Sequence, residues 1–316
     1  MENAFELSAV ICTHNPRADY LRRVLDALAG QTLPCHQWQL LLIDNASGRA
    51  LAESWDLSWH PHSRIIREDQ LGLTPARLRG IREAMTDLLV FSDDDTVFNP
   101  NYLAEALRIA HEWPMLGAWG GQPMPEFETP PPEWSKPYLS MLGLCQTARD
   151  FWSNNYHGNA CPIGAGLCIR REVALQYAAC LSHSSGRLHL DRTGKLLLAG
   201  GDTDMAFTAC DMGMGIGRFV SLGFLHLIPS RRLELQYLLA MREGMVYSDL
   251  ILDSYRRQRF PLKPFARSLF GYVWRILRGD FHERKFQLAA LRGEFKARRQ
   301  LAHSTPTPLT NDASRM

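Results

Sequence analysis

The 316-residue sequence contains no run of about 18 consecutive apolar residues, the length that a membrane-spanning helix requires. It also lacks a basic N-terminal segment followed by an apolar stretch, so we expect no cleaved signal peptide. These two absences argue against membrane-spanning helices and against secretion. We therefore expect a cytoplasmic protein.

Cysteine is scarce, with seven residues scattered along the chain, an odd number without any Cys-x-x-Cys spacing. This pattern argues against a disulfide framework and against a cysteine zinc site. We interpret the cysteines as reduced and mostly buried thiols.

Positive and negative charges nearly balance over the whole chain, which has a net charge of only +2. However, residues 256–299 contain 13 Lys and Arg against three Asp and Glu, a local net charge of +10. The rest of the chain holds 22 basic and 30 acidic residues, a net charge of −8. The basic character is therefore a local feature of one segment.

Apolar segments that end in polar residues alternate with helical segments over the first 115 residues. The segments FELSAVICTHN, WQLLLIDNAS, SRIIRED and DLLVFSDDD predict strands, and the segments between and after them predict helices. This alternation predicts an α/β fold with a mostly parallel sheet flanked by helices. The polar strand ends, Thr13–Asn15, Asp44–Ser47 and Asp93–Asp95, should meet at the edge where such sheets bind ligands.

The remaining chain divides into a connector, a mixed region, a helical region and a tail. The proline-rich connector PEFETPPPEW is expected to be neither regular helix nor central strand. We predict an α/β domain over residues 1–228, with a nucleotide-binding half at about 1–115 and a second half at about 116–228. A helical extension should follow over 229–301, and the polar residues 302–316 should be disordered.

Three adjacent carboxylates, Asp93, Asp94 and Asp95, follow the apolar segment LLVFS. Carboxylates about 5 Å apart repel by about 3 kcal/mol per pair at an effective dielectric of about 20, so a cation, a proton or solvent must compensate. At the end of a buried strand, Asp94 and Asp95 are suited to hold a divalent cation that bridges to a diphosphate. The alternative is an acidic approach to the next helix, which is favourable to the helix dipole.

A second acidic pair, Asp202 and Asp204, follows two glycines in LLAGGDTDMAF. Asp202 fits the N-cap of a helix that starts near Thr203, and a capping carboxylate that faces a ligand crevice can also serve as a general base. His226 follows an apolar strand segment. It is either a core residue or, if its strand end meets Asp95, a metal ligand.

Six motifs in chain order resemble those of the family-2 glycosyltransferases with the GT-A fold, over roughly residues 7–228. They are SAVICTHN, LLLIDNAS, LGLTPARLRGI, VFSDDDT, IGAGLCIRR and GGDTD. In the last motif Gly201 stands where the family commonly has Glu, so the resemblance gives the base role to Asp202. The three aspartates leave the register of the DXD metal motif open.

The resemblance implies inverting transfer of a sugar from a UDP-, dTDP- or GDP-linked donor to a hydroxyl of a glycan or lipid-linked acceptor, in cell-envelope polysaccharide biosynthesis. It implies a general base, Asp202, and Mn²⁺ or Mg²⁺ held by Asp95 and His226. Asp44 would read the nucleobase, Asp93 or Asp94 would contact the ribose or a metal-bound water, and Arg77 or Arg79 the diphosphate. The residues expected to bind the nucleotide sugar are Thr13, Asn15, Asp44, Arg77, Arg79, Asp93, Asp94, Gly164 and Gly166, with Trp119, Trp134 and Trp152 as candidates for stacking on sugar rings.

The segment PLKPFARSLFGYVWRILRGDF interleaves aromatic and aliphatic residues with arginines. It predicts a basic amphipathic helix of the kind that lies on an anionic membrane surface, which suits a peripheral enzyme with a lipid-linked acceptor. The alternative is a helix packed on the catalytic domain with a solvated basic face. Nucleic acid is not an expected partner, because the chain lacks a known binding motif.

Two rival hypotheses come from the same residues. LLVFSDDDTV also resembles the nucleophile motif of haloacid-dehalogenase-type phosphatases, in which Asp93 would attack phosphorus and Asp95 would act as acid and base. That motif normally follows the first strand of its fold, whereas here at least two strands precede it. The other rival is a non-catalytic GT-A-like binding module that recruits partners at a membrane.

Overall fold

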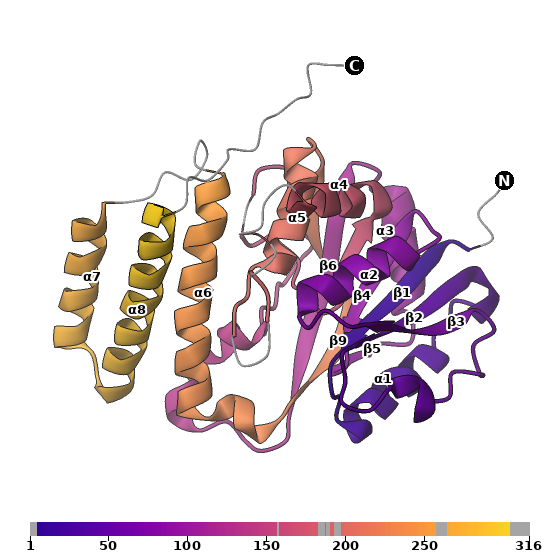
Figure 1. The fold of residues 1–316 in the computed structure, drawn as a ribbon, viewed down its shortest axis with the longest axis horizontal. Helices are drawn as coiled ribbons and strands as arrows, with labels where there is room; N and C mark the ends of the chain where they lie inside the picture. Colours follow the sequence, from indigo (N-terminus) through magenta and orange to yellow (C-terminus); the bar gives the residue numbers. More distant parts are fainter. Residues whose placement is uncertain are drawn as a thin grey trace.

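Nine strands of the described residues form one sheet, in the order β3-β2-β1-β4-β8-β6-β9-β5, with β7 paired to β9 (Figure 1). The computed structural model describes residues 5–156, 158–182, 187, 190–192, 197–256 and 264–303. The strands are β1 Leu7–Thr13, β2 Trp38–Asn45, β3 Ser63–Glu68, β4 Leu88–Asp93, β5 Thr96–Phe98, β6 Leu116–Phe127, β7 Phe151–Ser153, β8 Cys168–Arg170 and β9 Gly215–Ile228. The helices are α1 Ala18–Ala29, α2 Leu73–Glu83, α3 Tyr102–Glu112, α4 Arg171–Ser182, α5 Gly201–Asp211, α6 Leu235–Tyr255, α7 Phe265–Arg278 and α8 Phe281–His303, with short 3-10 turns η1 Cys35–Gln37, η2 Leu51–Glu53, η3 Glu133–Leu142 and η5 Ser230–Leu233.

The first four strands along the chain pair in parallel, as predicted. β1 and β2 are buried at every position, as expected of parallel strands that helices cover on both faces. Their register places Thr13 beside Asp44, and Cys12 beside Asp93. The polar ends of β1, β2 and β4 therefore meet at one edge of the sheet.

Beyond β4 the sheet is mixed. β8 is antiparallel to both β4 and β6, β9 is parallel to β6, and β5 and β7 are antiparallel to β9. The turn at Asp94 and Asp95 leads from β4 directly into β5, in which Thr96 pairs with His226 of β9. The chain thus brings the aspartates to the strand that carries His226, although 130 residues separate them in sequence.

The first three residues of the proline-rich connector form the end of a strand with a partner on one side only, which agrees with the prediction that the connector is not a central strand. β6 extends to Phe127 and pairs with β9, with Pro125 opposite His226. Proline is tolerated there because β8 pairs only with Ala118 and Trp119, so this part of β6 has no described neighbour on its other side. The strand can therefore continue as an edge.

Alternating residues of the buried strands face two layers of helices. One apolar cluster packs Leu7, Ala9 and Ile11 of β1 against α1 and α3. The other packs Val10 and Cys12 against α2, α4 and α5. Figure 1 shows α1 on one side of the sheet and α2, α4 and α5 on the other.

The described residues after β9 are helical, as predicted. α6 packs against α8 through Leu238, Phe286 and their neighbours near one end, and through Ile251 and Ala297 near the other. α7 packs on α8 and lies farthest from the sheet (Figure 1). No helix in the described ranges is long and apolar enough to span a membrane. The boundaries at 228 and 301 stay predictions, and the tail beyond residue 303 lies outside the described residues.

Gly121 lies at a register shift between β6 and β9, where the two backbones approach closely. A Cβ atom at this position would overlap the carbonyl oxygen of Leu222. We predict that Gly121→Ala destabilises the protein by about 3 kcal/mol or more, because backbone cannot move aside as a side chain can. Chemical denaturation measures this effect. Gly158→Ala, where a Cβ meets nothing within 4 Å, is the control, and equal midpoints for the two variants would contradict the prediction.

Candidate active site

Thr13, Asp93 and Asp94 lie together where β1 and β4 end. The Thr13 hydroxyl donates a hydrogen bond to the Asp94 carboxylate. Burial and the neighbouring charge of Asp95 raise the pKa of Asp94 to about 7 and also raise the pKa of Asp93. The two carboxyl groups are thus held where their charged forms are disfavoured, and a cation placed beside them would relieve this.

Asp95 is paired with protein cations. Its Oδ2 atom lies 2.7 Å from Nη2 of Arg232 and 3.7 Å from Nε2 of His226. Burial favours a higher pKa for Asp95, but Arg232 and then His226 outweigh it and hold that pKa well below its usual range. The condition for His226 as a ligand candidate is met, since its strand does reach Asp95.

The residues around Asp95 fit a divalent cation in part. Oδ1 of Asp95 and Nδ1 of His226 are buried and have no hydrogen-bond partner among the described residues. A carboxylate oxygen and an imidazole nitrogen suit Mn²⁺, and the oxygen suits Mg²⁺. Nowhere in the described ranges do three or more His, Cys, Asp or Glu side chains converge as a metal site. A cation held by these two residues would have to complete its coordination with substrate phosphate oxygens and water.

Asp202 lies in the first turn of α5, whose N-cap is Gly200, so it is not the N-cap that the sequence suggested. Its Oδ2 atom accepts a hydrogen bond of 2.8 Å from the Gly164 backbone N–H, and its Oδ1 accepts one of 2.8 Å from Thr203. A side chain at position 164 would overlap the guanidinium of Arg77. Gly164 therefore permits the close approach that orients the Asp202 carboxylate.

Gly166 is held by the core. Its φ of +75° favours glycine, its N–H donates to the Phe91 carbonyl at 3.0 Å, and its carbonyl accepts from the Tyr102 hydroxyl at 2.6 Å. The glycine loop is thus anchored at Gly166 and contacts Asp202 at Gly164. A contact of either glycine with a donor sugar stays a prediction.

Arg77 and Arg79 point to different surroundings, as expected for residues two apart on a helix. Arg77 is 3% exposed, and its Nη1 lies 3.0 Å from Oδ2 of Asp191. It is also within electrostatic range of Asp93 and Asp202. Arg79 instead forms an ion pair of 2.9 Å with Glu83 along α2. Of the two, Arg77 is the better placed for an anionic ligand at the sheet edge.

Asp44 and Asn15 organise the turns that follow β2 and β1. The Asp44 carboxylate accepts hydrogen bonds from the Ser47 and Leu51 backbone N–H groups, both at 3.1 Å, and from Arg67 at 3.0 Å. Burial opposes its charge, but these donors lower the pKa of Asp44. Asn15, at φ 48°, accepts from the Gly48 N–H at 2.9 Å. Nucleobase contact by Asp44 remains a prediction, now for a carboxylate with several protein partners.

The three candidate stacking tryptophans have different surroundings. Trp119 is 0% exposed and lies in the core, so its ring face is not open to a sugar. Trp134 stacks on His282 of α8, with ring centroids 4.7 Å apart. Trp152 is 43% exposed beside Trp113, which leaves it the most accessible of the three.

Asp204 is not a site residue but the centre of a buried ion-pair network. It accepts two hydrogen bonds from Arg187, at 2.8 and 2.7 Å, and one from Arg256 at 2.9 Å. Arg256 also pairs with Asp211 at 2.7 Å. The network joins both ends of α5 to the residue that follows α6, so it fixes the helix that carries Asp202.

Three residues near the site escaped the sequence analysis: Asp191, Arg192 and Arg232. Asp191 accepts hydrogen bonds from Thr74 at 3.1 Å and from the Gly201 N–H at 3.1 Å, in addition to Arg77. Arg192 is within electrostatic range of Asp93 and Asp95. Arg232 had a visible signal, the Arg-Arg pair six residues after His226. The other two lie in a segment without periodicity, where no pattern marked them.

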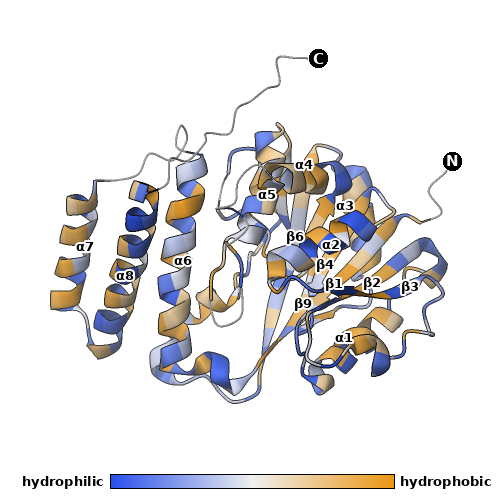
Figure 2. Cartoon of the chain, in the orientation of Figure 1, coloured by the Kyte–Doolittle hydropathy of each residue, from blue (hydrophilic) through white to orange (hydrophobic). Residues whose placement is uncertain are grey.

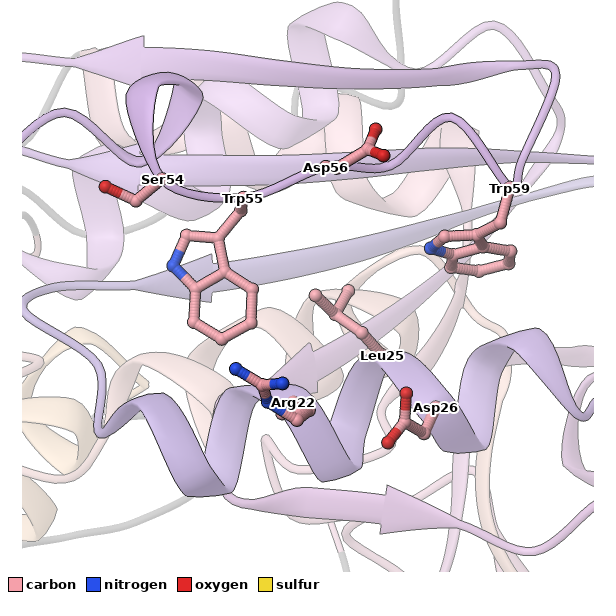
Figure 3. A pocket seen from close by; sticks show the side chains of 7 residues that line it. All are labelled: Arg22, Leu25, Asp26, Ser54, Trp55, Asp56 and Trp59. Carbon is pink, nitrogen blue, oxygen red and sulfur yellow. The ribbon is translucent and has the colours of Figure 1, made fainter.

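A separate hollow of about 250 Å³ lies between α1 and the segment that follows η2 (Figure 3). None of the predicted site residues lines it. The lining residues are Arg22, Leu25, Asp26, Ser54, Trp55, Asp56 and Trp59.

Comparison with known proteins identifies relatives in sequence and in fold. Residues 8–174, more than half of the chain, match the family described as "Glycosyl transferase family 2". The crystal structure of S. aureus TarS 1-349 aligns with a TM-score of 0.51 and 13% identity, over 94% of this chain and 92% of that one. The structure of the same protein in complex with UDP-GlcNAc aligns with a TM-score of 0.51 and 12% identity, over the same shares. No curated protein sequence matches this chain.

Proposed function

Because the chain belongs to glycosyl transferase family 2, we propose that it transfers a sugar, with inversion, from a nucleoside diphosphate donor to a hydroxyl of a glycan or lipid-linked acceptor. The fold is the GT-A fold that the sequence predicted. One observation carries the proposal. Buried Arg77 is within electrostatic range of both Asp93 at the acidic strand end and Asp202 at the start of α5. The proposed leaving-group site and the proposed base would therefore share one region.

On the donor side, the proposed ligands are the polar strand ends. Thr13 already donates a hydrogen bond to Asp94, and Asp93 or Asp94 would accept a hydrogen bond from a ribose hydroxyl. Arg77, Arg192 and Arg232 supply positive charge for the diphosphate. The fold shared with TarS, which was crystallised with UDP-GlcNAc, favours UDP over dTDP or GDP as the first nucleotide to test.

Asp95 and His226 would hold Mn²⁺ or Mg²⁺, which when bound neutralises the diphosphate as it departs. Arg232 now occupies the Oδ2 side of Asp95, while Oδ1 has no partner in the described part of the chain. The protein would thus offer the open oxygen and the imidazole as ligands.

Asp202 would accept the proton of the acceptor hydroxyl as this oxygen attacks the anomeric carbon from the face opposite to the diphosphate. The Gly164 N–H holds one carboxylate oxygen and the Thr203 N–H the other. Carboxylate oxygens have further lone pairs, so both contacts leave acceptor capacity.

The reaction would take place in the cytoplasm, in cell-envelope polysaccharide synthesis.

We predict that UDP with Mn²⁺ raises the melting temperature of the protein and that Asp95→Asn abolishes the Mn²⁺-dependent part. Ligand at about 100 times its dissociation constant stabilises the native state by about 2.7 kcal/mol. Differential scanning fluorimetry with UDP, dTDP and GDP, each with and without Mn²⁺, measures this. Asp26→Asn, an exposed position on α1, is the control. If no nucleotide shifts the melt with metal present, the transferase proposal fails; if Asp95→Asn keeps the full shift, the ligand assignment is wrong.

The phosphatase hypothesis loses its basis, because β4 is the fourth strand of the chain and the family match covers it. The hypothesis of a non-catalytic module predicts nucleotide binding without turnover. Release of UDP from UDP-sugars in the presence of candidate acceptors separates the module from the enzyme.

A further inference from the structure

The helix α7 is a part of the described chain that the proposed reaction does not use. None of its residues is buried. Among the described elements, α8 is the one against which it packs extensively. We propose that α7 lies flat on an anionic lipid bilayer and inserts its apolar side chains among the lipid headgroups. The proposal stands on this surface and does not require the transferase activity.

The apolar side chains of α7 form one exposed stripe. Leu269, Phe270, Val273, Trp274 and Leu277 recur at intervals of three to four residues, and Phe270 and Leu277 are each 74% exposed. Phe281, 62% exposed at the start of α8, extends the apolar surface past the end of α7. In Figure 2 much of the ribbon of α7, the helix farthest from the sheet, has the colour of hydrophobic residues. Soluble surfaces rarely leave such a contiguous apolar stripe in water.

Unpaired cations border this stripe. Arg267, Arg275 and Arg278 are exposed, and no carboxylate of the described residues lies within ion-pair distance of them. The Arg278 guanidinium lies 4.6 Å from the centre of the Trp274 ring, so the charge stands directly beside the apolar surface. This arrangement lets apolar side chains enter the interface while guanidinium groups reach lipid phosphates.

The charges select the partner. An anionic bilayer matches the guanidinium groups of Arg267, Arg275 and Arg278, which are exposed along α7. A nucleic acid would match the charge but would leave the apolar stripe in water. A second copy that docks the same face symmetrically would bring identical arginines together, which is repulsive. At 14 residues, α7 is too short to cross a bilayer, which requires about 20.

The membrane face is joined to the candidate site through packed helices. α7 packs on α8 and α8 on α6. Leu252 and Ser248 of α6 lie close enough to Gly200 that a Cβ there would meet each of them at 3.1 Å. Gly200 is the N-cap of the helix that carries Asp202. A bilayer bound at α7 would therefore be held on the α6 side of the site.

Flotation of the 316-residue chain with vesicles tests the proposal. We expect binding to vesicles of phosphatidylcholine mixed with phosphatidylglycerol, weaker at high salt, and little binding to phosphatidylcholine alone. The variant Phe270→Ser/Trp274→Ser/Leu277→Ser should bind about 100-fold more weakly or worse. Arg275→Gln/Arg278→Gln should lose about fivefold in affinity per arginine at low salt.

Met85→Ser is the matched control, because it also replaces an exposed apolar side chain with serine. Met85 is 61% exposed and lies just beyond α2, far along the chain from α7. This variant should bind vesicles as the unmodified protein does, and all variants should keep their melting temperature, since the changed residues are exposed. The proposal is overturned if the unmodified chain ignores anionic vesicles, or if the triple serine variant binds them equally well. It is also overturned if light scattering shows that the unmodified protein is a dimer and that the triple serine variant is a monomer. Loss of vesicle binding with intact nucleotide binding, or the reverse, separates this proposal from the proposed reaction.

Discussion

Asp202→Asn is expected to lower kcat by about 10²- to 10⁴-fold, the contribution of a positioned general base. Asparagine has the same shape, and its amide oxygen can still accept the hydrogen bond that Gly164 donates at 2.8 Å, whereas its NH2 group cannot accept the one from Thr203. The loss that affects catalysis is the capacity to take a proton from the acceptor hydroxyl. Steady-state rates of UDP release at saturating donor and acceptor measure the effect.

The dissociation constant for the nucleotide should stay within a few-fold in this variant, because Asp202 is assigned to the acceptor side. Asp26→Asn controls for a change of one surface carboxylate. An unchanged kcat in Asp202→Asn would remove Asp202 from the mechanism. A parallel loss of UDP binding would instead indicate that the substitution disturbs the donor site.

Asp204→Asn is expected to destabilise the fold by about 3–5 kcal/mol, because it leaves buried cations without their counter-charge. Asp204 is 0% exposed, and two guanidinium groups, Arg187 and Arg256, lie against it. Denaturant unfolding followed by circular dichroism measures the change in midpoint. A shift no larger than that of Asp26→Asn would mean that the network contributes little.

The ion pairs of Asp204 also lead us to predict how stability changes at low pH. Burial opposes the charge of Asp204, but Arg187 and Arg256 outweigh it and lower the pKa of this carboxyl in the folded state. A folded pKa below the unfolded value of about 3.9 gives stability that is complete above that value and is lost as the pH falls toward the folded pKa. The unmodified protein should therefore lose its advantage over Asp204→Asn as the pH drops below about 4. A constant difference between pH 7 and pH 3 would contradict this reading.

The sequence was sufficient to predict those features that depend on local patterns of apolar and polar residues. Apolar runs that end in Thr13, Asp44 and Asp93 located the strands and the edge at which they meet, because a parallel strand that is buried on both faces has few alternatives. The motif around Asp202 and the strand with His226 were found in the same way. Arg77 and Arg79 could have been separated too, since a helix turns them to different sides.

The pairings between distant residues could not be predicted. Arg232 approaches Asp95, and Arg187 and Arg256 approach Asp204, only because the mixed half of the sheet and α6 bring them there. Asp204 shows the limit most clearly. It is two residues from Asp202 and has the same chemistry, but the helix turns it into the core. The strand at Pro125 was missed for a related reason, since proline is excluded from a sheet interior but not from an edge.

The side-by-side packing of α7, α8 and α6 has a consequence for which acceptors the protein can reach. Neighbouring helix axes are about 8–10 Å apart, so α6 and the turn beside Asp202 stand on the order of 20 Å from the plane of α7. If that plane rests on lipid, the thickness of the three packed helices sets the height of the reacting hydroxyl above the headgroups. Acceptors that carry the hydroxyl at that height would be modified, and chains too short to rise to it would be passed over.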